Sequence, residues 1–250
     1  MKKPQAKFSA IQKWFWLCTV FICSGWCSNL YADEKNDPFR FEITPYLWVA
    51  SIKGTVAAGG GESPPIDSNY SFFSLDNVDG VASATFTARK KQWGLLFDFL
   101  YVAYEDTFLE GTPLPITPRL EGRIIEFAGS YTPSSIENLD FIAGLRRQDI
   151  TISLASLNRK PEQAAIWTDA FAGIIYSLPL KGNFQATFRG DLGGSKSDIA
   201  VNAEAMLRYQ LGDTFSMKFG YRYLKVKFND TDFIYDLSLD GFLFGLGIHF

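Results

Sequence analysis

The chain has 250 residues, of which 16% are aromatic and 20% charged, and a net charge of −3, enough for one sizeable domain or two small ones. Residues 1–32 hold four lysines and no acid, so the remainder keeps 20 of the 24 bases against 27 acids, a net charge of −7. A net acidic chain gives no support for nucleic-acid binding, because contacts with phosphates need clustered Lys and Arg.

Residues 1–32 are predicted to be a cleaved secretory signal. A basic start ends at Lys13, an uncharged apolar stretch follows, and Ala32 supplies a small residue at the cut before Asp33. A permanent membrane anchor is the alternative, but Ser24 and Gly25 interrupt the apolar run before it reaches spanning length.

All three cysteines, Cys18, Cys23 and Cys27, fall within this signal. Residues 33–250 therefore offer no disulfide, no thiolate metal site and no cysteine nucleophile. Lipid attachment at Cys27 is disfavoured by the bulky Trp26 before it.

Beyond residue 38 the recurring feature is period-two alternation of apolar and polar residues, cut by turn residues, which predicts β-strands. No stretch of 18 consecutive apolar residues appears, so no membrane helix is expected. Ten strands are predicted: 39–56, 80–90, 93–106, 117–133, 139–154, 164–178, 183–194, 198–211, 214–228 and 233–250.

Each predicted strand has one apolar and one polar face, as in "WGLLFDFLYVA" and "FSMKFGYRY". This pattern suits a soluble barrel or sandwich with an apolar core, or a membrane barrel with the apolar face toward lipid. Tyr and Trp near strand ends favour the second, because such barrels carry aromatic girdles at both interfaces. A small exported soluble domain would also more often use disulfides.

The sequence therefore predicts an all-β protein: a closed antiparallel transmembrane β-barrel over residues 33–250, in the outer membrane of a Gram-negative bacterium. Ten strands are expected, with eight or twelve as alternatives. An even number puts both chain ends and the tight turns on the periplasmic side and the longer loops outside. We expect a monomer.

The chain ends on "DGFLFGLGIHF", an alternating apolar ladder. In a closed barrel the last strand must pair with the first, which would place this ladder against lipid. The terminal ladder resembles the signal that the barrel-assembly machinery of Gram-negative bacteria recognises. It consists of Phe242, Phe244, Leu246, Ile248 and Phe250.

A wider resemblance rests on "WTDAFAGIIYSLPL", "RGDLGG", "GYRYLKVKF" and "GLGIHF". These segments resemble a family of uncharacterised Gram-negative outer-membrane β-barrel proteins, among the OmpA- and OmpW-like small barrels in the broad sense. Ala170 stands where that family usually has Pro. The resemblance implies fold and location and no activity.

Catalytic chemistry is not expected. The single histidine, His249, is the penultimate residue, and we expect an interfacial side chain at the periplasmic rim. No carboxylate pair, phosphate loop or metal-ligand spacing appears, and "GDLGGSKS" lacks the strand–loop–helix context of a nucleotide site. No cofactor and no metal are predicted, and a barrel enzyme hydrolysing lipid or peptide at the outer surface is the alternative.

The strongest candidates for functional residues are charged side chains that are expected to point into the lumen. They are either a paired network that fills a narrow barrel or the lining of a wet passage for small solutes. The leading function is thus a barrel without catalysis, either structural or passively permeable. The predicted lumen charges are Glu42, Asp98, Glu126, Arg146, Arg189, Asp191, Glu204, Arg208 and Arg222.

Two further features concern the outer rim. Lys225 and Lys227 occupy positions on the face that is apolar earlier in their strand. This indicates either a bulge or outward lysines that bind lipopolysaccharide phosphates. A similar switch at Asp240 and Gly241 indicates another bulge or kink. The loop over residues 57–78 could bind a partner or adhere to a surface. Expected partners are outer-membrane lipids, lipopolysaccharide and the assembly machinery, and no nucleic acid.

Overall fold

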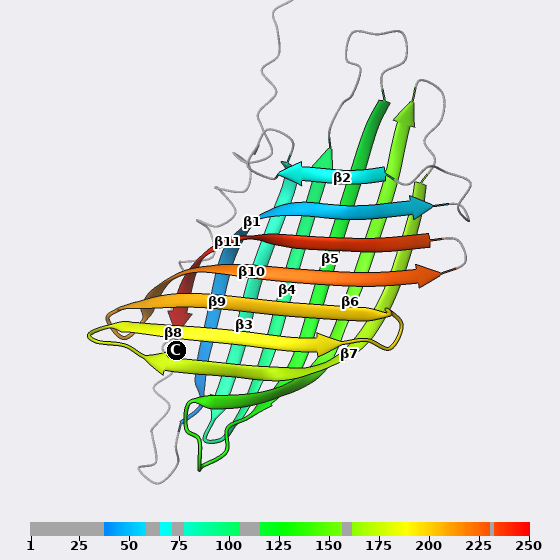
Figure 1. Cartoon of the computed structure of the whole chain (residues 1–250). Coiled ribbons are helices and arrows are strands. Elements are labelled where there is room, and N and C mark those ends of the chain that lie inside the picture. The colour runs from blue at the N-terminus through cyan, green and yellow to red at the C-terminus, as the bar shows by residue number, and fades with distance from the viewer. Residues whose placement is uncertain (1–37, 59–65, 72–77, 106–115, 157–161, 231–232) are drawn as a thin grey trace, which may run out of the picture. The chain divides into compact units, whose positions relative to one another are not determined.

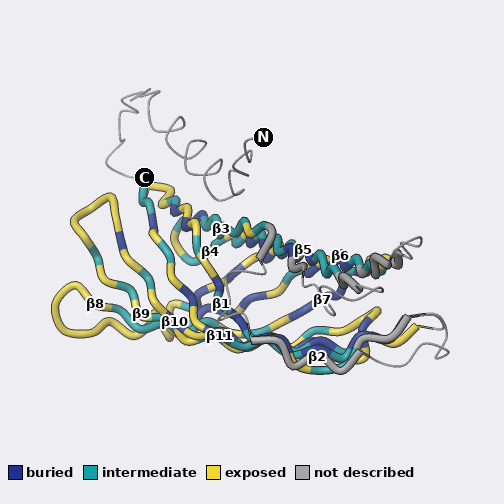
Figure 2. The backbone as a smooth tube through the Cα atoms, turned by 90° about the horizontal axis from the view of Figure 1, so that it is seen from above, coloured by how far each residue is buried: buried dark blue, intermediate teal, exposed yellow. Residues whose placement is uncertain are grey.

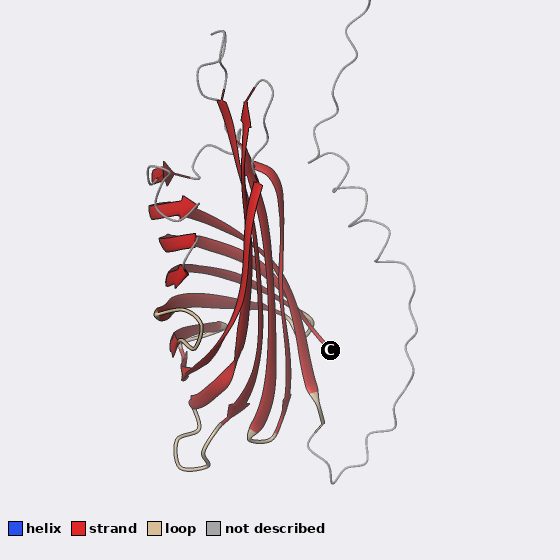
Figure 3. Ribbon diagram, turned by 90° about the vertical axis from the view of Figure 1, so that its right-hand side faces the viewer, coloured by secondary structure: helices blue, strands red, loops and turns tan. Residues whose placement is uncertain are grey.

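The computed structural model describes residues 38–58, 66–71, 78–105, 116–156, 162–230 and 233–250. Figure 3 shows only strands and their connections in these ranges, and none of their residues belongs to a helix long and apolar enough to span a membrane. The strands are β1 (Arg40–Ala58), β2 (Ile66–Ser71), β3 (Val78–Lys90), β4 (Trp93–Glu105), β5 (Ile116–Tyr131), β6 (Leu139–Ser156), β7 (Glu162–Pro179), β8 (Phe184–Gly193), β9 (Ile199–Leu211), β10 (Phe215–Asp230) and β11 (Phe233–His249).

Ten long strands, β1 and β3–β11, close into an antiparallel barrel, and their ends lie within a few residues of the predicted ones. From β3 to β11 each strand pairs with the next, and β11 closes the circle against β1, as in Ile43 opposite Ile248. In Figure 1 the strands β3–β7 form one wall, and β8–β11 cross it steeply in the other. The predicted fold class is confirmed.

Strand β1 changes neighbours along its length. Its first part, Arg40–Pro45, pairs with β3, whereas Ser51–Val56 pairs with β2. The ladder to β3 ends at Pro45, which has no N–H to donate. The prediction of a loop over residues 57–78 was thus wrong for residues 57 and 58, which belong to β1, and for residues 66–71, which form a strand paired with the later part of β1.

The chain terminus is held by backbone hydrogen bonds. The amide of Phe41 donates to the carbonyl of Phe250 over 2.9 Å, and the amide of Phe250 donates to the carbonyl of Phe41 over 3.1 Å. The two rings stack with centroids 5.6 Å apart, and Phe39 stacks on Phe41 at 5.7 Å. The final residue is therefore part of the barrel closure rather than a frayed end.

The two faces of the wall exchange polarity part way along the strands. Figure 2 shows buried and exposed residues alternating along the chain. On β10 the outward residues are first apolar and then basic: Phe215, Met217, Phe219, Tyr221, Tyr223, Lys225 and Lys227. The inward residues run the other way, from polar to apolar: Ser216, Lys218, Gly220, Arg222, Leu224, Val226 and Phe228.

The predicted bulges are absent from these strands. The pairing of β10 with β9 and with β11 runs without a register shift, and Leu224 and Val226 are 0% exposed. Residues alternate between the outward and the inward face along the whole of β10, so Lys225 and Lys227 point outward. What changes is the environment, because here the barrel interior is apolar and its exterior polar. The kink predicted at Asp240 and Gly241 is wrong for the same reason, since that register is also continuous.

Gly241 is required by close packing. A Cβ on this inward residue would lie 1.9 Å from the backbone oxygen of Val49. We expect Gly241→Ala to lower the free energy of unfolding by about 1–3 kcal/mol, the cost of overpacking a tight site. Chemical denaturation of the barrel in lipid vesicles would measure this. The control is Gly190→Ala, where a Cβ meets nothing within 4 Å, and an equal loss in both variants would contradict the packing argument.

Candidate functional site: a charged belt and a cavity inside the barrel

The barrel has two distinguishable ends. The turn end carries residue 250 and the short connections around Gln92, Pro133, Gly182 and Gly212, whereas the other, the loop end, carries β2. Near the turn end the outer wall is an apolar band with aromatic residues such as Trp93, Tyr131 and Tyr209, each more than a third exposed. An outward apolar band with such a girdle is the surface a lipid bilayer requires.

Inside this band lies a charged belt centred on Glu126, whose side chain is 0% exposed. Its carboxylate accepts hydrogen bonds from Arg146 Nε at 2.7 Å, Arg189 Nη2 at 2.7 Å and Arg222 Nη2 at 2.9 Å. These residues come from four strands, β5, β6, β8 and β10, so the belt ties opposite walls of the barrel together.

Two more acids complete the belt. Asp191 accepts from Arg146 Nη2 at 2.7 Å and from Arg189 Nε at 2.8 Å, while Asp98 accepts from Arg222 Nη1 at 3.1 Å. Neutral groups add to it: Asn202 links Arg222 to Asp191, and the Tyr46 hydroxyl donates to Asp98 at 3.0 Å. Buried charges are tolerated when they are paired and hydrogen-bonded in this way.

Glu204 differs from the other acids of the belt. It lies opposite Arg222 on β10 and Arg189 on β8, yet both guanidinium groups turn to other acceptors. In the described part of the chain its carboxylate has neither a hydrogen bond nor an ion pair within 4.0 Å, although both arginines act on it electrostatically.

Toward the loop end the belt gives way to an apolar core. This core is a cluster of buried aliphatic and aromatic side chains from opposite walls, with the Arg222 guanidinium 5.1 Å from the Trp48 ring centroid at the boundary. Its buried members are Trp48, Ala50, Ile52, Leu100, Ile124, Ile150, Trp167, Ala200, Leu224, Val226, Tyr235, Leu237, Leu239 and Leu243.

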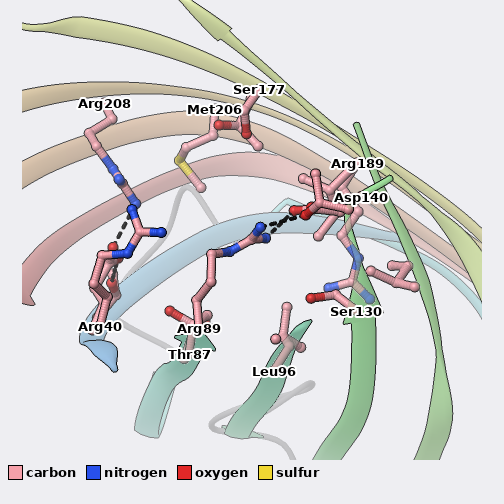
Figure 4. Close-up of a pocket in the computed structure, with 18 of the residues that line it drawn as sticks. Arg40, Thr87, Arg89, Leu96, Ser130, Asp140, Ser177, Arg189, Met206 and Arg208 are labelled. Carbon is pink, nitrogen blue, oxygen red and sulfur yellow. Dashed lines mark hydrogen bonds and ion pairs between the residues drawn. The ribbon is translucent and has the colours of Figure 1, made fainter. Parts of the chain in front are cut away.

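On the turn-end side of the belt the interior opens into a cavity of about 710 Å³. Arg189, Glu204 and Arg222 of the belt contribute to its lining, and the rest comes mostly from the turn end. Figure 4 shows Arg40 and Arg208 on one side of this cavity and Arg89 pointing toward Asp140. The cavity is thus bounded by the charged belt at its floor.

Glu42 organises the mouth of the cavity. Arg208 Nη2 donates to its carboxylate at 2.6 Å, Lys218 donates to the other oxygen, and Thr44 Oγ1 donates at 2.7 Å. Two strong bases therefore share one carboxylate. Across the mouth, Arg89 and Thr132 both donate to Asp140.

His249 also lies at the mouth, but it points into the barrel and not toward the membrane interface as predicted. Its Nε2 is 2.9 Å from Ser216 Oγ and its Nδ1 is 3.4 Å from Glu42 Oε2. The order serine, histidine, carboxylate is that of a hydrolytic triad. Ser216 is 0% exposed, however, and Glu42 is already engaged by two bases, Arg208 and Lys218.

The segment "GGSKS" between β8 and β9 is hydrogen-bonded to the side chain of Asp169 on β7. The backbone amides of Ser195, Lys196 and Ser197 donate to Asp169 Oδ1 at 2.9–3.1 Å, and Ser197 Oγ donates to Asp169 Oδ2 at 2.6 Å. Three amides converge as they would on a phosphate, but a buried carboxylate occupies them. The segment is therefore a structural turn.

Outside the apolar core, the outer wall is a charged collar. Its ion pairs include Lys53 with Asp240 at 3.3 Å, Arg123 with Asp149 at 3.6 Å and Lys225 with Asp236 at 3.8 Å. Lys227 shares this outward face. Contact of Lys225 and Lys227 with lipopolysaccharide stays a prediction.

The structure brings the predicted lumen charges into two groups. Glu126, Arg146, Arg189, Asp191, Asp98, Glu204 and Arg222 lie in or beside the belt, and Glu42 and Arg208 lie at the mouth. Sequence reasoning left out Lys218, Arg89 and Asp140, although alternation along their strands put Lys218 and Asp140 on the polar face. The terminal ladder faces outward, with Phe242, Phe244, Leu246 and Phe250 each at least 41% exposed.

No group of three or more His, Cys, Asp or Glu side chains suited to a metal ion occurs within the described ranges.

A closed barrel with an outward apolar band and an inward charged belt defines an outer-membrane β-barrel protein. No protein-family model matches the chain, and no curated protein matches it. Among solved structures, the translocator domain of the autotransporter NalP from Neisseria meningitidis is 12% identical, with a TM-score of 0.44, 87% of this chain and 90% of that chain covered. Ail of Yersinia pestis in complex with a heparin analogue is 10% identical, with a TM-score of 0.41 and coverages of 85% and 98%. Likeness at this level identifies no shared function.

Proposed function

We propose that this protein is a structural outer-membrane barrel that neither conducts solutes nor catalyses a reaction. The observation that carries the proposal is the succession of two barriers across the interior. The charged belt joins opposite walls through Glu126, and the apolar core lies directly behind it.

Both barriers oppose the passage of solutes. A hydrated ion entering from the cavity meets a belt whose three arginines and three of whose acids, Glu126, Asp191 and Asp98, already pair with one another, so it gains little on losing its water to pass between them. Behind the belt it meets a region where aliphatic and aromatic side chains predominate, which offers an ion few polar ligands. A passive pore would instead present an uninterrupted polar lining.

Orientation follows from the two ends. In outer-membrane barrels the short turns and chain termini face the periplasm, which assigns the turn end to that side and the charged collar to the cell surface. The collar then projects beyond the lipid, where Lys225 and Lys227 are available to lipopolysaccharide phosphates. Assembly by the outer-membrane assembly machinery rests on the outward terminal ladder.

Single-channel recording in planar lipid bilayers tests the proposal. We expect the folded protein to insert, as shown by protection from external protease, and to give no stepwise conductance. Steady conductance steps that scale with salt concentration would contradict a closed interior, and passive passage of solutes would then be the favoured function.

A second candidate is partner binding through residues 57–78, favoured by the strand β2, which anchors part of this segment on the outer part of β1. Its test keeps the strand and scrambles residues 59–65 and 72–77. Loss of adhesion to surfaces or cells with an unchanged barrel would support this candidate, and unchanged adhesion would eliminate it.

A further inference from the structure

We propose that the cavity at the turn end is a binding site for short peptides with a free amino terminus and a free carboxyl terminus. The inference goes beyond the closed structural barrel and does not depend on it, because a blind cavity and an open pore could both bind such a ligand. It rests on charges that the barrel leaves uncompensated at two different depths of the cavity.

At the floor the imbalance is negative. The belt contains three bases, Arg146, Arg189 and Arg222, whereas its acids number four. Three of these acids are paired directly, and the fourth, Glu204, lines the cavity without an ion pair or hydrogen bond in the described residues. A carboxylate in that situation is a receptor for a cationic hydrogen-bond donor such as an α-ammonium group.

At the mouth the imbalance is positive. Four bases are counted in the lining there, namely Arg40, Arg89, Arg208 and Lys218, against the three acids Glu42, Glu137 and Asp140. Arg208 and Lys218 share the single carboxylate of Glu42. Arg40 has no ion pair or hydrogen bond among the described residues, so its guanidinium is available to a carboxylate of a ligand.

The separation of the two charges selects the length of the ligand. Arg40 lies on the same side of the cavity as Arg208 (Figure 4), so Arg208 sets the scale of the separation. Glu204 and Arg208 are both inward residues of β9, four positions apart, which is about 13 Å along a strand. An extended peptide spans about 3.3–3.6 Å per residue, so three residues reach from one charge to the other once the side chains extend inward.

Size and lining agree with this ligand. A cavity of about 710 Å³ lies within the range that holds small organic ligands. Hydroxyl and amide groups between floor and mouth can pair with peptide N–H and C=O groups. These are Thr85, Thr87, Ser130, Ser177, Gln185 and Thr187.

Isothermal titration of the full-length protein, purified from outer membranes in detergent, with trialanine tests the proposal. We expect saturable binding of trialanine and at least tenfold weaker binding of N-acetyl-trialanine and of trialanine amide, because each lacks one terminal charge. Glu204→Gln should weaken trialanine binding at least tenfold and leave the affinity for N-acetyl-trialanine unchanged. Arg40→Gln should likewise weaken the binding of trialanine at least tenfold and leave the affinity for trialanine amide unchanged.

The matched control is Lys53→Gln, a variant in the outward collar, whose side chain is 57% exposed and remote from the cavity lining. It should bind trialanine as the parent does, and heat-modifiable electrophoretic migration should show that every variant is folded. The proposal is overturned by an absence of saturable binding at millimolar trialanine. Equal affinities for free and blocked peptides, or no effect of Glu204→Gln in a folded barrel, would overturn it as well.

Discussion

Glu126→Ala is expected to be the most damaging single substitution in the barrel. It removes the acceptor of three guanidinium groups, Arg146, Arg189 and Arg222, in a site where Glu126 and Arg146 are 0% exposed. Removing one partner of a buried ion pair costs about 3–5 kcal/mol, since the other charge stays buried without compensation. Here three charges are affected, so we expect at least that loss in the free energy of unfolding.

Denaturant titration of the barrel in lipid vesicles would measure this loss. The control is Glu121→Ala on the same strand, an outward residue whose pairing with Arg119 is partly exposed, with side chains 35% and 37% exposed. Exposed ion pairs contribute about 0–1 kcal/mol. Similar losses in the two variants would show that the belt does not hold the walls together.

Leu224→Ala is expected to destabilise the barrel by about 2–5 kcal/mol, the usual cost of removing a buried leucine side chain and leaving a cavity. Leu224 is 0% exposed and belongs to the apolar core toward the loop end. The result distinguishes a bulge in β10 from a regular strand whose inward face becomes apolar. A bulge at this level would have turned Leu224 outward, where truncation would have little effect.

The neighbouring residue provides the control. Lys225 points outward, its side chain is 43% exposed, and its contact with Asp236 is 3.8 Å long. Lys225→Ala should therefore change the free energy of unfolding by no more than about 0.5 kcal/mol, as surface substitutions do. If Lys225→Ala were the costlier change, the assignment of the two faces would be reversed.

The polarity exchange also explains how one strand serves two surroundings. Where Phe219 and Tyr221 face outward, the inward residue between them is Gly220 and the next is Arg222, which belongs to the belt. Four residues further on, Lys225 faces outward and Leu224 inward. The first arrangement suits lipid outside and paired charges inside, and the second is that of a water-soluble barrel.

Period-two alternation along the sequence determined the ten long strands, because each strand has one face toward lipid or water and one toward the interior. The same alternation placed Glu126, Arg146 and Arg222 inward. The terminal ladder determined the closure, since the edge of the last strand needs a partner and only the first strand is available.

The tertiary structure alone decided which charges pair, because Glu126 meets Arg222 across the barrel from a position 96 residues away. It also decided that Leu224 points into the barrel. A bulge that turns a strand over and a change of environment around a regular strand produce the same shift of apolar residues in the sequence, and only the pairing with the neighbouring strands distinguishes them. Finally, it showed that Glu204 and Arg40 have no direct hydrogen-bond or ion-pair partner among the residues that the structure describes. That property depends on where every other side chain goes and is not encoded in any local stretch of sequence.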